Sequence, residues 1–125
     1  MSQIKFTEDH EWLLLDEDGN FTIGITDYAH EQLGDIVFVE LPEIGAEIVA
    51  GDEAAVVESV KAAGDIRAPI NGTVCEVNEL LVEAPEKVNS DPMGEGWFFK
   101  ITPIDPDEIN TMMDEDAYWD YIAGL

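Results

Sequence analysis

The sequence predicts a mainly β domain, a small sandwich or flattened barrel with short helices, the clearest of them at its C-terminal end. Its apolar residues lie mostly in short runs, and Gly, Pro, Asn and Asp separate these runs, as is typical of strands joined by turns. The clearest helix-start signals come after residue 104. The length of 125 residues fits one compact domain, over 1–125.

The N-terminal part of the chain predicts a hairpin, a short helix and a buried strand. In order, these elements are expected at Glu11–Leu15, Phe21–Ile25, Asp27–Leu33 and Ile36–Val39. Thr26 is a good helix-capping residue, and Gly34 is placed to end the helix. The last strand closes at Pro42, which cannot donate to a strand ladder.

Two later stretches are loosely alike. Gly45–Asp52 and Gly72–Glu79 each open with glycine, run through five residues and close in a turn pair whose second member is acidic. The similarity predicts two related β units packed face to face. Cys75, the single cysteine, lies inside the second stretch and is expected to be a small buried side chain in a strand.

The C-terminal third predicts an irregular segment, a strand and two helices. Pro, Asn, Ser and Gly punctuate residues 79–96, so no regular element is expected there. Trp97–Ile101 reads as a strand. Asp105-Pro106 is an acidic cap followed by proline at the first helical position, which starts a helix. A second helix is expected over about Asp114–Ile122.

The chain is strongly acidic, with five Lys and Arg against 29 Asp and Glu and a formal charge of −24. This charge repels phosphate backbones and anionic lipids, so nucleic-acid and membrane-surface binding are disfavoured. No apolar run approaches the ~18 residues of a membrane span, and the first ten residues show no signal or transit pattern, so a cytoplasmic location is expected. Solubility, steering towards basic partners and a salt-adapted source would each account for the acidity.

The residue sets that most enzymes need are missing. Only two histidines occur, His10 and His30, and both are expected to be surface or structural residues. There is no Gly-rich phosphate loop, and one cysteine excludes a multi-cysteine metal site. The chain is therefore expected not to be an enzyme by itself.

One lysine stands out, because no Lys or Arg occurs in the 55 residues between Lys5 and Lys61. Lys61 lies among small neighbours between two strand-like runs, Ala54–Val57 and Ile66–Pro69. Its turn has no central glycine, which favours type I over the mirror-image hairpin turns. A projecting lysine suits covalent modification, since its amine must act as a nucleophile in another protein's active site. A lysine that only aids solubility fits the composition as well.

The segment Glu58-Ser59-Val60-Lys61-Ala62 resembles the lipoyl-attachment motif of the glycine cleavage H-protein family. Further motifs of this family are matched at His10–Trp12, Ile23–Ala29, Leu33–Pro42, Gly72–Val74, Val77-Asn78 and Asp91–Trp97. The resemblance implies a barrel-sandwich hybrid of two packed antiparallel sheets, with the lipoylated lysine at a hairpin tip. Lipoyl domains in general also have glycine sixteen residues before and eleven residues after that lysine, here Gly45 and Gly72.

The resemblance also implies a function and a set of partners. Such proteins carry an aminomethyl group on a lipoyl arm from a pyridoxal-phosphate-dependent glycine decarboxylase to a folate-dependent aminomethyltransferase. Dihydrolipoamide dehydrogenase reoxidises the arm, and lipoate-attachment enzymes install it. By resemblance, Lys61 would hold lipoic acid, Glu58 is the acidic residue of the motif, and Glu11 and Asp65 lie beside the cleft that receives the arm. A carboxylate there would bind the amine through a charge-assisted hydrogen bond.

Three positions depart from the family pattern. Met93 lies where an aromatic residue is common, Arg67 replaces another aromatic residue, and Asp9 replaces a frequent serine. These changes are expected to affect local docking at most.

Other interpretations compete with this one. A lipoyl domain of a 2-oxo acid dehydrogenase usually has Asp before the lysine, and a biotin carrier has Met beside it, where this chain has Val60 and Ala62. An H-like protein that donates lipoyl groups to other complexes fits the same motifs. An acidic interaction protein that mimics nucleic acid would explain the charge but not the motifs.

Overall fold

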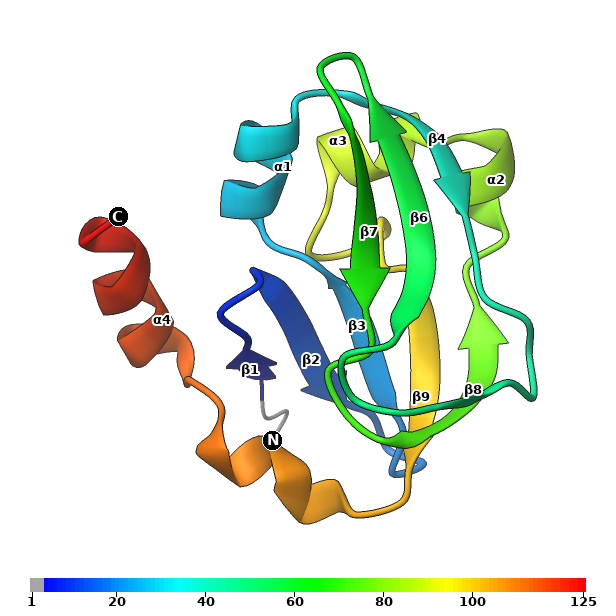
Figure 1. Ribbon diagram of the computed structural model, residues 1–125, viewed down its shortest axis with the longest axis vertical. Helices are drawn as coiled ribbons and strands as arrows, with labels where there is room; N and C mark the ends of the chain where they lie inside the picture. The colour runs from blue at the N-terminus through cyan, green and yellow to red at the C-terminus, as the bar shows by residue number, and fades with distance from the viewer. Residues whose placement is uncertain (1–3) are drawn as a thin grey trace.

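The computed structural model describes residues 4–125 and contains two antiparallel sheets packed against each other (Figure 1). The larger sheet has the strand order β1-β2-β3-β9-β8-β5, and the smaller has the order β4-β6-β7. The strands are β1 Ile4–Phe6, β2 Glu11–Leu15, β3 Phe21–Ile25, β4 Ile36–Glu40, β5 Glu47–Ile48, β6 Glu53–Ser59, β7 Ala63–Arg67, β8 Gly72–Val77 and β9 Phe99–Pro103. The predicted fold class, mainly β with two packed antiparallel sheets, is confirmed.

Short helices connect and flank the sheets. They are α1 Asp27–Leu33, α2 Leu80–Glu83, α3 Glu86–Ser90, the 3₁₀ helix η1 Pro106–Thr111 and α4 Glu115–Ala123. Three of them begin at an oxygen-bearing side chain that accepts a backbone N–H of the first turn, Thr26 for α1, Asp105 for η1 and Asp114 for α4. None of the helices within residues 4–125 is long and apolar enough to cross a membrane.

The prediction of no regular structure in residues 79–96 is wrong, because α2 and α3 lie there. Both helices are only about one turn long, and neither has a side-chain cap, so they leave no periodicity or capping signal in the sequence. The prediction that two similar β units pack face to face is also wrong. Residues of these units pair edge to edge, as β5 with β8, in the same sheet.

Two clusters of buried side chains hold the layers together. The main core fills the space between the two sheets and includes Leu13, Ile23, Val57, Ile101 and their neighbours. A smaller cluster of Phe6, Trp12 and Tyr118 fastens α4 to the strands β1 and β2. The rings of Phe6 and Tyr118 stack with centroids 4.5 Å apart. The C-terminal helix is therefore anchored outside the main core, at the edge of the larger sheet (Figure 1).

Strand ends differ from expectation by a few residues. The strand predicted at Trp97–Ile101 runs over Phe99–Pro103, although Phe98 already donates its N–H to the Ile23 carbonyl of β3. Cys75 lies in β8, as expected, but beside an irregularity in the pairing with β9, and its side chain is only partly buried.

Candidate functional site

Lys61 lies at the tip of the β6–β7 hairpin, which protrudes at one end of the molecule (Figure 1). The hairpin is closed by Ser59, whose backbone N–H donates to the Ala62 carbonyl over 2.7 Å. The Ser59 hydroxyl donates to the same carbonyl and accepts the backbone N–H groups of Lys61 and Ala62 at 3.2 and 3.0 Å. The backbone is thus fixed by local bonds while the lysine side chain stays exposed.

The turn conformation agrees with the sequence. Besides glycine, only His10 has a positive φ within residues 4–125, so Val60 and Lys61 do not form a mirror-image hairpin turn. A second segment supports the tip from the side, where the carbonyl of Asp35 accepts the Val60 N–H at 3.0 Å. Gly34, with φ +83°, leaves room for the lysine stem: a Cβ there would lie 3.2 Å from the Lys61 Cδ.

Glu58 lies on β6, three residues before Lys61, with Phe38 of β4 and Ala63 of β7 as its strand partners. Its side chain is exposed. Two large apolar side chains are exposed close by, Phe38 at 46% and Val60 at 68%. The hairpin end therefore combines the free lysine with an acidic residue and uncovered apolar surface.

A cleft of about 270 Å³ lies beside the hairpin and contains both Glu11 and Asp65. Its walls come from the start of β2, from α1 and from β7, and they include Asp9, His10, Leu33 and Arg67. The structure therefore brings together the two acidic residues that the resemblance singled out, although they are 54 residues apart in the chain. Two of the three positions that depart from the family pattern, Asp9 and Arg67, line the same cleft.

Glu11 is the most unusual carboxyl group of the cleft, because its side chain is only 3% exposed. One oxygen accepts the backbone N–H of Arg67 at 3.0 Å, and the other accepts the Thr7 hydroxyl at 3.4 Å. Burial, reinforced by the nearby charges of Asp9 and Asp65, raises the pKa of Glu11 to about 8, although both hydrogen bonds act in the opposite direction. Near neutral pH the Glu11 carboxyl group is therefore largely protonated and neutral, whereas the resemblance implies a carboxylate anion at this position.

Asp65 is more open to solvent than Glu11. Its Oδ2 lies 3.8 Å from the Nε of Arg67, and both side chains are well exposed, at 39% and 58%. Such an exposed pair holds its partners loosely. The guanidinium therefore neutralises part of the acidic charge at the mouth of the cleft.

A hydrogen-bonded chain begins at His10, which lines the cleft, and sequence reasoning missed it. The Nδ1 of His10 lies 2.9 Å from the hydroxyl of Tyr118, which lies 2.7 Å from the hydroxyl of Thr26. Thr26 in turn caps α1 by accepting the Ala29 N–H. Burial lowers the pKa of His10, against the opposing charge of Asp9. Only two separate sequence features pointed to it: Thr26 is a helix-capping residue, and Tyr118 lies in the helix predicted over about Asp114–Ile122.

Within residues 4–125, no group of three or more His, Cys, Asp or Glu side chains is arranged to hold a metal ion. The functional elements at this end are therefore an exposed lysine and a cleft with ionisable walls. A lysine on a fixed, protruding turn is suited to carrying a covalent group. A cleft beside it, lined by Leu33 and Ala29 as well as carboxyl groups, is suited to receiving the apolar stem and polar end of such a group.

The family model of the glycine cleavage H-protein matches residues 4–124. The chain belongs to the glycine cleavage H-protein family. It is 57% identical to the glycine cleavage system H protein of Rhodospirillum rubrum over 125 residues, covering 100% of this chain and 99% of that one. It is 58% identical to the H protein of Teredinibacter turnerae, over 94% of this chain and 90% of that one.

A solved structure gives the same result for the fold. The chain superimposes on the crystal structure of a glycine cleavage system H protein from Mycobacterium marinum with a TM-score of 0.86 and 35% identity, covering 98% of each chain. The resemblance identified from the sequence motifs is thus confirmed.

The structure explains why this H-protein chain has glycine at positions 45 and 72. Gly45 has φ +92°, a left-handed conformation that side chains rarely adopt. A Cβ on Gly72 would lie 2.4 Å from the backbone oxygen of Thr102, where β8 and β9 approach each other. One glycine therefore serves a turn and the other serves close strand packing.

Proposed function

We propose that the chain is the lipoyl-bearing carrier of the glycine cleavage system and that Lys61 is its attachment site. The observation that carries the proposal is the fixed, protruding turn with an exposed lysine beside a cleft containing Glu11 and Asp65. A lipoyl group on this lysine supplies a dithiolane that accepts and releases an aminomethyl group. The chain itself is not an enzyme in this proposal; it presents, shelters and moves the group.

The residues around the hairpin are proposed to have different roles in this function. Ser59 and Asp35 hold the turn, so that the Lys61 amine is displayed to a lipoate-attachment enzyme. Glu58 lies next to it on the exposed surface and is proposed to contact that enzyme. Glu11 and Asp65 line the cleft, where the amine of the carried group would bring a positive charge next to Glu11.

A cation next to Glu11 would favour its ionised form and so lower its raised pKa. Binding of the carried amine is therefore expected to release a proton from Glu11 near neutral pH. This turns a buried, neutral carboxyl group into one half of a charged pair. The proposal thus accounts for the burial of an acidic side chain that forms no ion pair with a Lys or Arg within residues 4–125.

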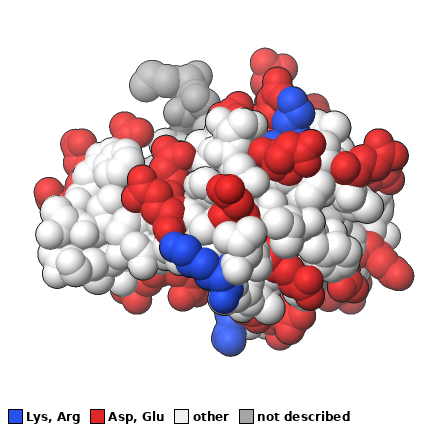
Figure 2. Space-filling model, turned by 90° about the horizontal axis from the view of Figure 1, so that it is seen from above, with Lys and Arg blue, Asp and Glu red and all other residues white. Residues whose placement is uncertain are grey.

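The proposed partners are glycine decarboxylase, the folate-dependent aminomethyltransferase, dihydrolipoamide dehydrogenase and lipoate-attachment enzymes, all in the cytoplasm. Figure 2 looks onto the hairpin end and shows Asp and Glu distributed over this face with few Lys and Arg between them. Such a field would speed encounter with basic docking surfaces. The association rate with glycine decarboxylase should therefore fall steeply as ionic strength rises; a flat response would leave solubility or salt adaptation as the reason for the acidity.

The attachment site is tested by the variant Lys61→Arg, with Lys87→Arg as the matched control. Arginine keeps the positive charge but offers no competent acceptor amine, so a lipoate ligase should leave Lys61→Arg unmodified and still modify Lys87→Arg. Intact mass spectrometry gives the result, because one lipoyl group adds a fixed mass. Modification of the Lys61→Arg variant would disprove the assignment.

A second role uses the same hairpin: an H-like protein can pass its lipoyl group to other lipoate-dependent complexes. Two assays on the lipoylated protein distinguish the two roles. Loading with an aminomethyl group by glycine decarboxylase supports the carrier role. Transfer of the lipoyl group to a 2-oxo acid dehydrogenase domain, without such loading, supports the donor role.

A further inference from the structure

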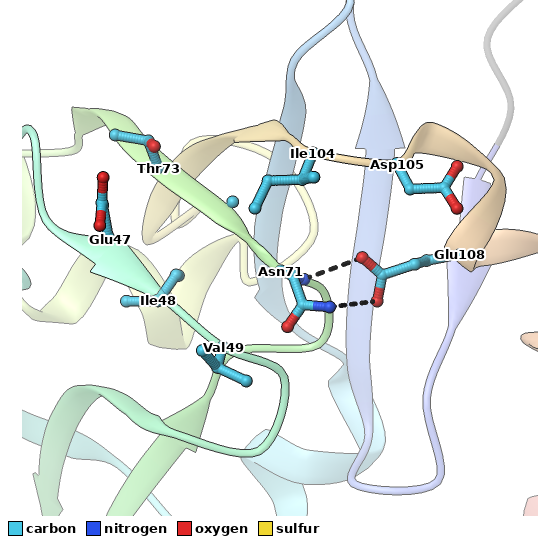
Figure 3. A pocket seen from close by; sticks show the side chains of 9 residues that line it. Glu47, Ile48, Val49, Asn71, Thr73, Ile104, Asp105 and Glu108 are labelled. Carbon is cyan, nitrogen blue, oxygen red and sulfur yellow. Dashed lines mark hydrogen bonds between the residues drawn. The ribbon is translucent and has the colours of Figure 1, made fainter.

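A groove of about 680 Å³ is lined by residues before β6 and after β9 (Figure 3), at the end of the molecule opposite the β6–β7 hairpin (Figure 1). It is the larger of the cavities at the two ends, since the cleft beside Lys61 measures about 270 Å³. Val49 of the groove precedes β6, whereas Lys61 follows it. The seven residues of β6 separate the two sites by about 20 Å, given ~3.3 Å per strand residue.

The groove exposes aliphatic side chains on two sides. Ile48 is buried at its base, but Val49 on one side is 60% exposed and Ile104 on the other is 78% exposed. These two residues come from the connection before β6 and the connection after β9, which are far apart in the chain. Covering them would remove apolar surface from water, which favours association.

Hydrogen bonds fix the shape of this groove. The backbone N–H and the side-chain amide of Asn71 donate to the two carboxylate oxygens of Glu108, at 3.1 and 3.3 Å (Figure 3). The side-chain oxygen of Asn71 accepts the Ala50 N–H at 2.8 Å. These bonds join the loop before β6, the start of β8 and η1, so the aliphatic side chains are held apart on a fixed frame.

The rim carries Glu47, Asp105 and Glu108, and no Lys or Arg lines the groove. The whole chain has a formal charge of −24, so a second copy would bring the same sign of charge to this rim. Nucleic acid and anionic membranes are repelled for the same reason. Only a positively charged occupant complements the rim while an aliphatic side chain fills the groove.

We propose that the groove docks a basic segment of a partner protein, with an aliphatic side chain between Val49 and Ile104 and with Lys or Arg side chains facing Glu47 at one end and Asp105 at the other. Docking at this end leaves the Lys61 hairpin free to enter an active site. A partner held there would raise the effective concentration of the arm. This last consequence rests on the proposed carrier function, whereas the docking itself does not require lipoylation.

The test uses the unlipoylated, ¹⁵N-labelled full chain and two peptides of equal charge, acetyl-Lys-Leu-Lys-Leu-Lys-amide and acetyl-Lys-Ser-Lys-Ser-Lys-amide. The leucine peptide should shift the amide signals of Val49, Asn71 and Ile104, and it should bind at least fivefold more tightly than the serine peptide. The variant Ile104→Ser should weaken the leucine peptide at least fivefold. The control Ile44→Ser, at a 62% exposed position outside the groove, should not.

The proposal would be overturned by equal binding of both peptides, by shifts spread over the acidic surface, or by unchanged affinity in Ile104→Ser. Absence of binding by the leucine peptide would overturn it as well. Because Ile104 is exposed, its replacement leaves the core intact, so a loss of binding is not a folding defect. Since the protein carries no lipoyl group in this test, a negative result leaves the role of Lys61 unaffected.

Discussion

Glu11 and Asp16 lie at the two ends of the same strand, and the protein places their carboxyl groups in opposite environments. Glu11 begins β2 and is buried at the cleft, with the backbone N–H of Arg67 and the Thr7 hydroxyl as its donors. Burial and like charges raise its pKa to about 8.

Asp16 directly follows β2 in the turn before β3. It accepts the backbone N–H groups of Asp18 and Asn20, and Lys100 lies 3.5 Å from its Oδ2. Burial acts to raise its pKa, but the hydrogen bonds and the ammonium outweigh burial and lower the pKa. Both groups have two hydrogen-bond donors, so the difference lies in solvent access and in the nearby charge. Among the described residues no Lys or Arg side chain forms an ion pair with Glu11, and a carried amine would do so.

The most direct functional difference between the two ends is expected from removing the cleft carboxylates. In Glu11→Gln or Asp65→Asn, a charge-assisted contact to the carried amine is lost, which typically contributes ~1.5–3 kcal/mol. Release of the aminomethyl group in the absence of folate should therefore become roughly 10- to 100-fold faster. The decay is followed after loading by glycine decarboxylase.

Glu53→Gln is the control for these variants, because Glu53 is an exposed carboxylate on the same hairpin. It should release the group at the wild-type rate. Wild-type lifetimes in both cleft variants, with lipoylation normal, would make Glu11 and Asp65 ordinary members of an acidic surface.

The second effect concerns stability against pH. Because the pKa of Glu11 is raised from 4.5 to about 8 in the folded protein, the folded state keeps a proton that the unfolded chain loses over this range. Folding stability contributed by this group therefore falls as pH rises from about 4.5 to 8, by up to ~1.4 kcal/mol per pH unit. Glu11→Gln removes the titration and should gain about 2–4 kcal/mol over wild type at pH 8.

Urea unfolding at pH 5 and pH 8.5 checks this expectation. The gain of Glu11→Gln should be small at pH 5, where the wild-type group is protonated in the folded protein. Glu53→Gln should show no such pH-dependent gain. An equal difference at both pH values would mean that the Glu11 carboxyl group is not the source.

A third, smaller effect tests whether α4 maintains the buried environment of the cleft. Tyr118→Phe removes the hydroxyl that joins His10 to Thr26, so two partners lose a buried bond. The free energy of unfolding should fall by about 1–3 kcal/mol. The imidazole signals of His10 should also titrate at a different pH, because its Nδ1 loses its partner.

Tyr121→Phe is the matched control, since Tyr121 packs near His10 but forms no hydrogen bond through its hydroxyl among the described residues. Chemical denaturation and NMR titration measure the two readouts. A Tyr118→Phe protein with wild-type stability and an unchanged His10 titration would show that α4 covers the sheet without supporting the cleft wall.

The sequence predicted the parts of this protein that depend on local patterns. Thr26 and Asp105 are predicted capping residues, and the structure confirms both as helix caps. The apolar runs and turn signals around residues 11–25 and 54–69 correspond to real hairpins. Lys61 could be singled out because it stands alone between strand-like runs, and its tip position follows directly from the hairpin.

The features that the sequence did not predict depend on contacts between distant segments. The 3-residue strand β1 is too short for a periodic signal, and it forms by pairing with β2 and bridging to Met113. The burial of Glu11 arises because β7 and the Thr7 segment close over it. The edge-to-edge pairing of β5 with β8 could not be separated from face-to-face packing, because both arrangements bury the same alternating residues.

The smallest expected effect is at Asp16, the opposite end of β2. Because its pKa is lowered in the folded protein, the Asp16 carboxylate contributes stability above its ordinary pKa of 3.8, and this contribution is lost as pH falls through the folded value.

Asp16→Asn keeps an oxygen that accepts the N–H groups of Asp18 and Asn20 but loses the attraction to Lys100. Its free energy of unfolding should be lower than that of wild type by about 0.5–1 kcal/mol at pH 7. The deficit should shrink towards pH 2.5, because the wild-type carboxylate takes up protons as the pH falls. Asp18→Asn, whose exposed side chain accepts no hydrogen bond among the described residues, is the control and should match wild type at both pH values. Thermal or urea unfolding gives both numbers. A deficit of the same size at pH 2.5 and pH 7 would attribute it to turn geometry, and the contrast between the two ends of β2 would then not be one of charge.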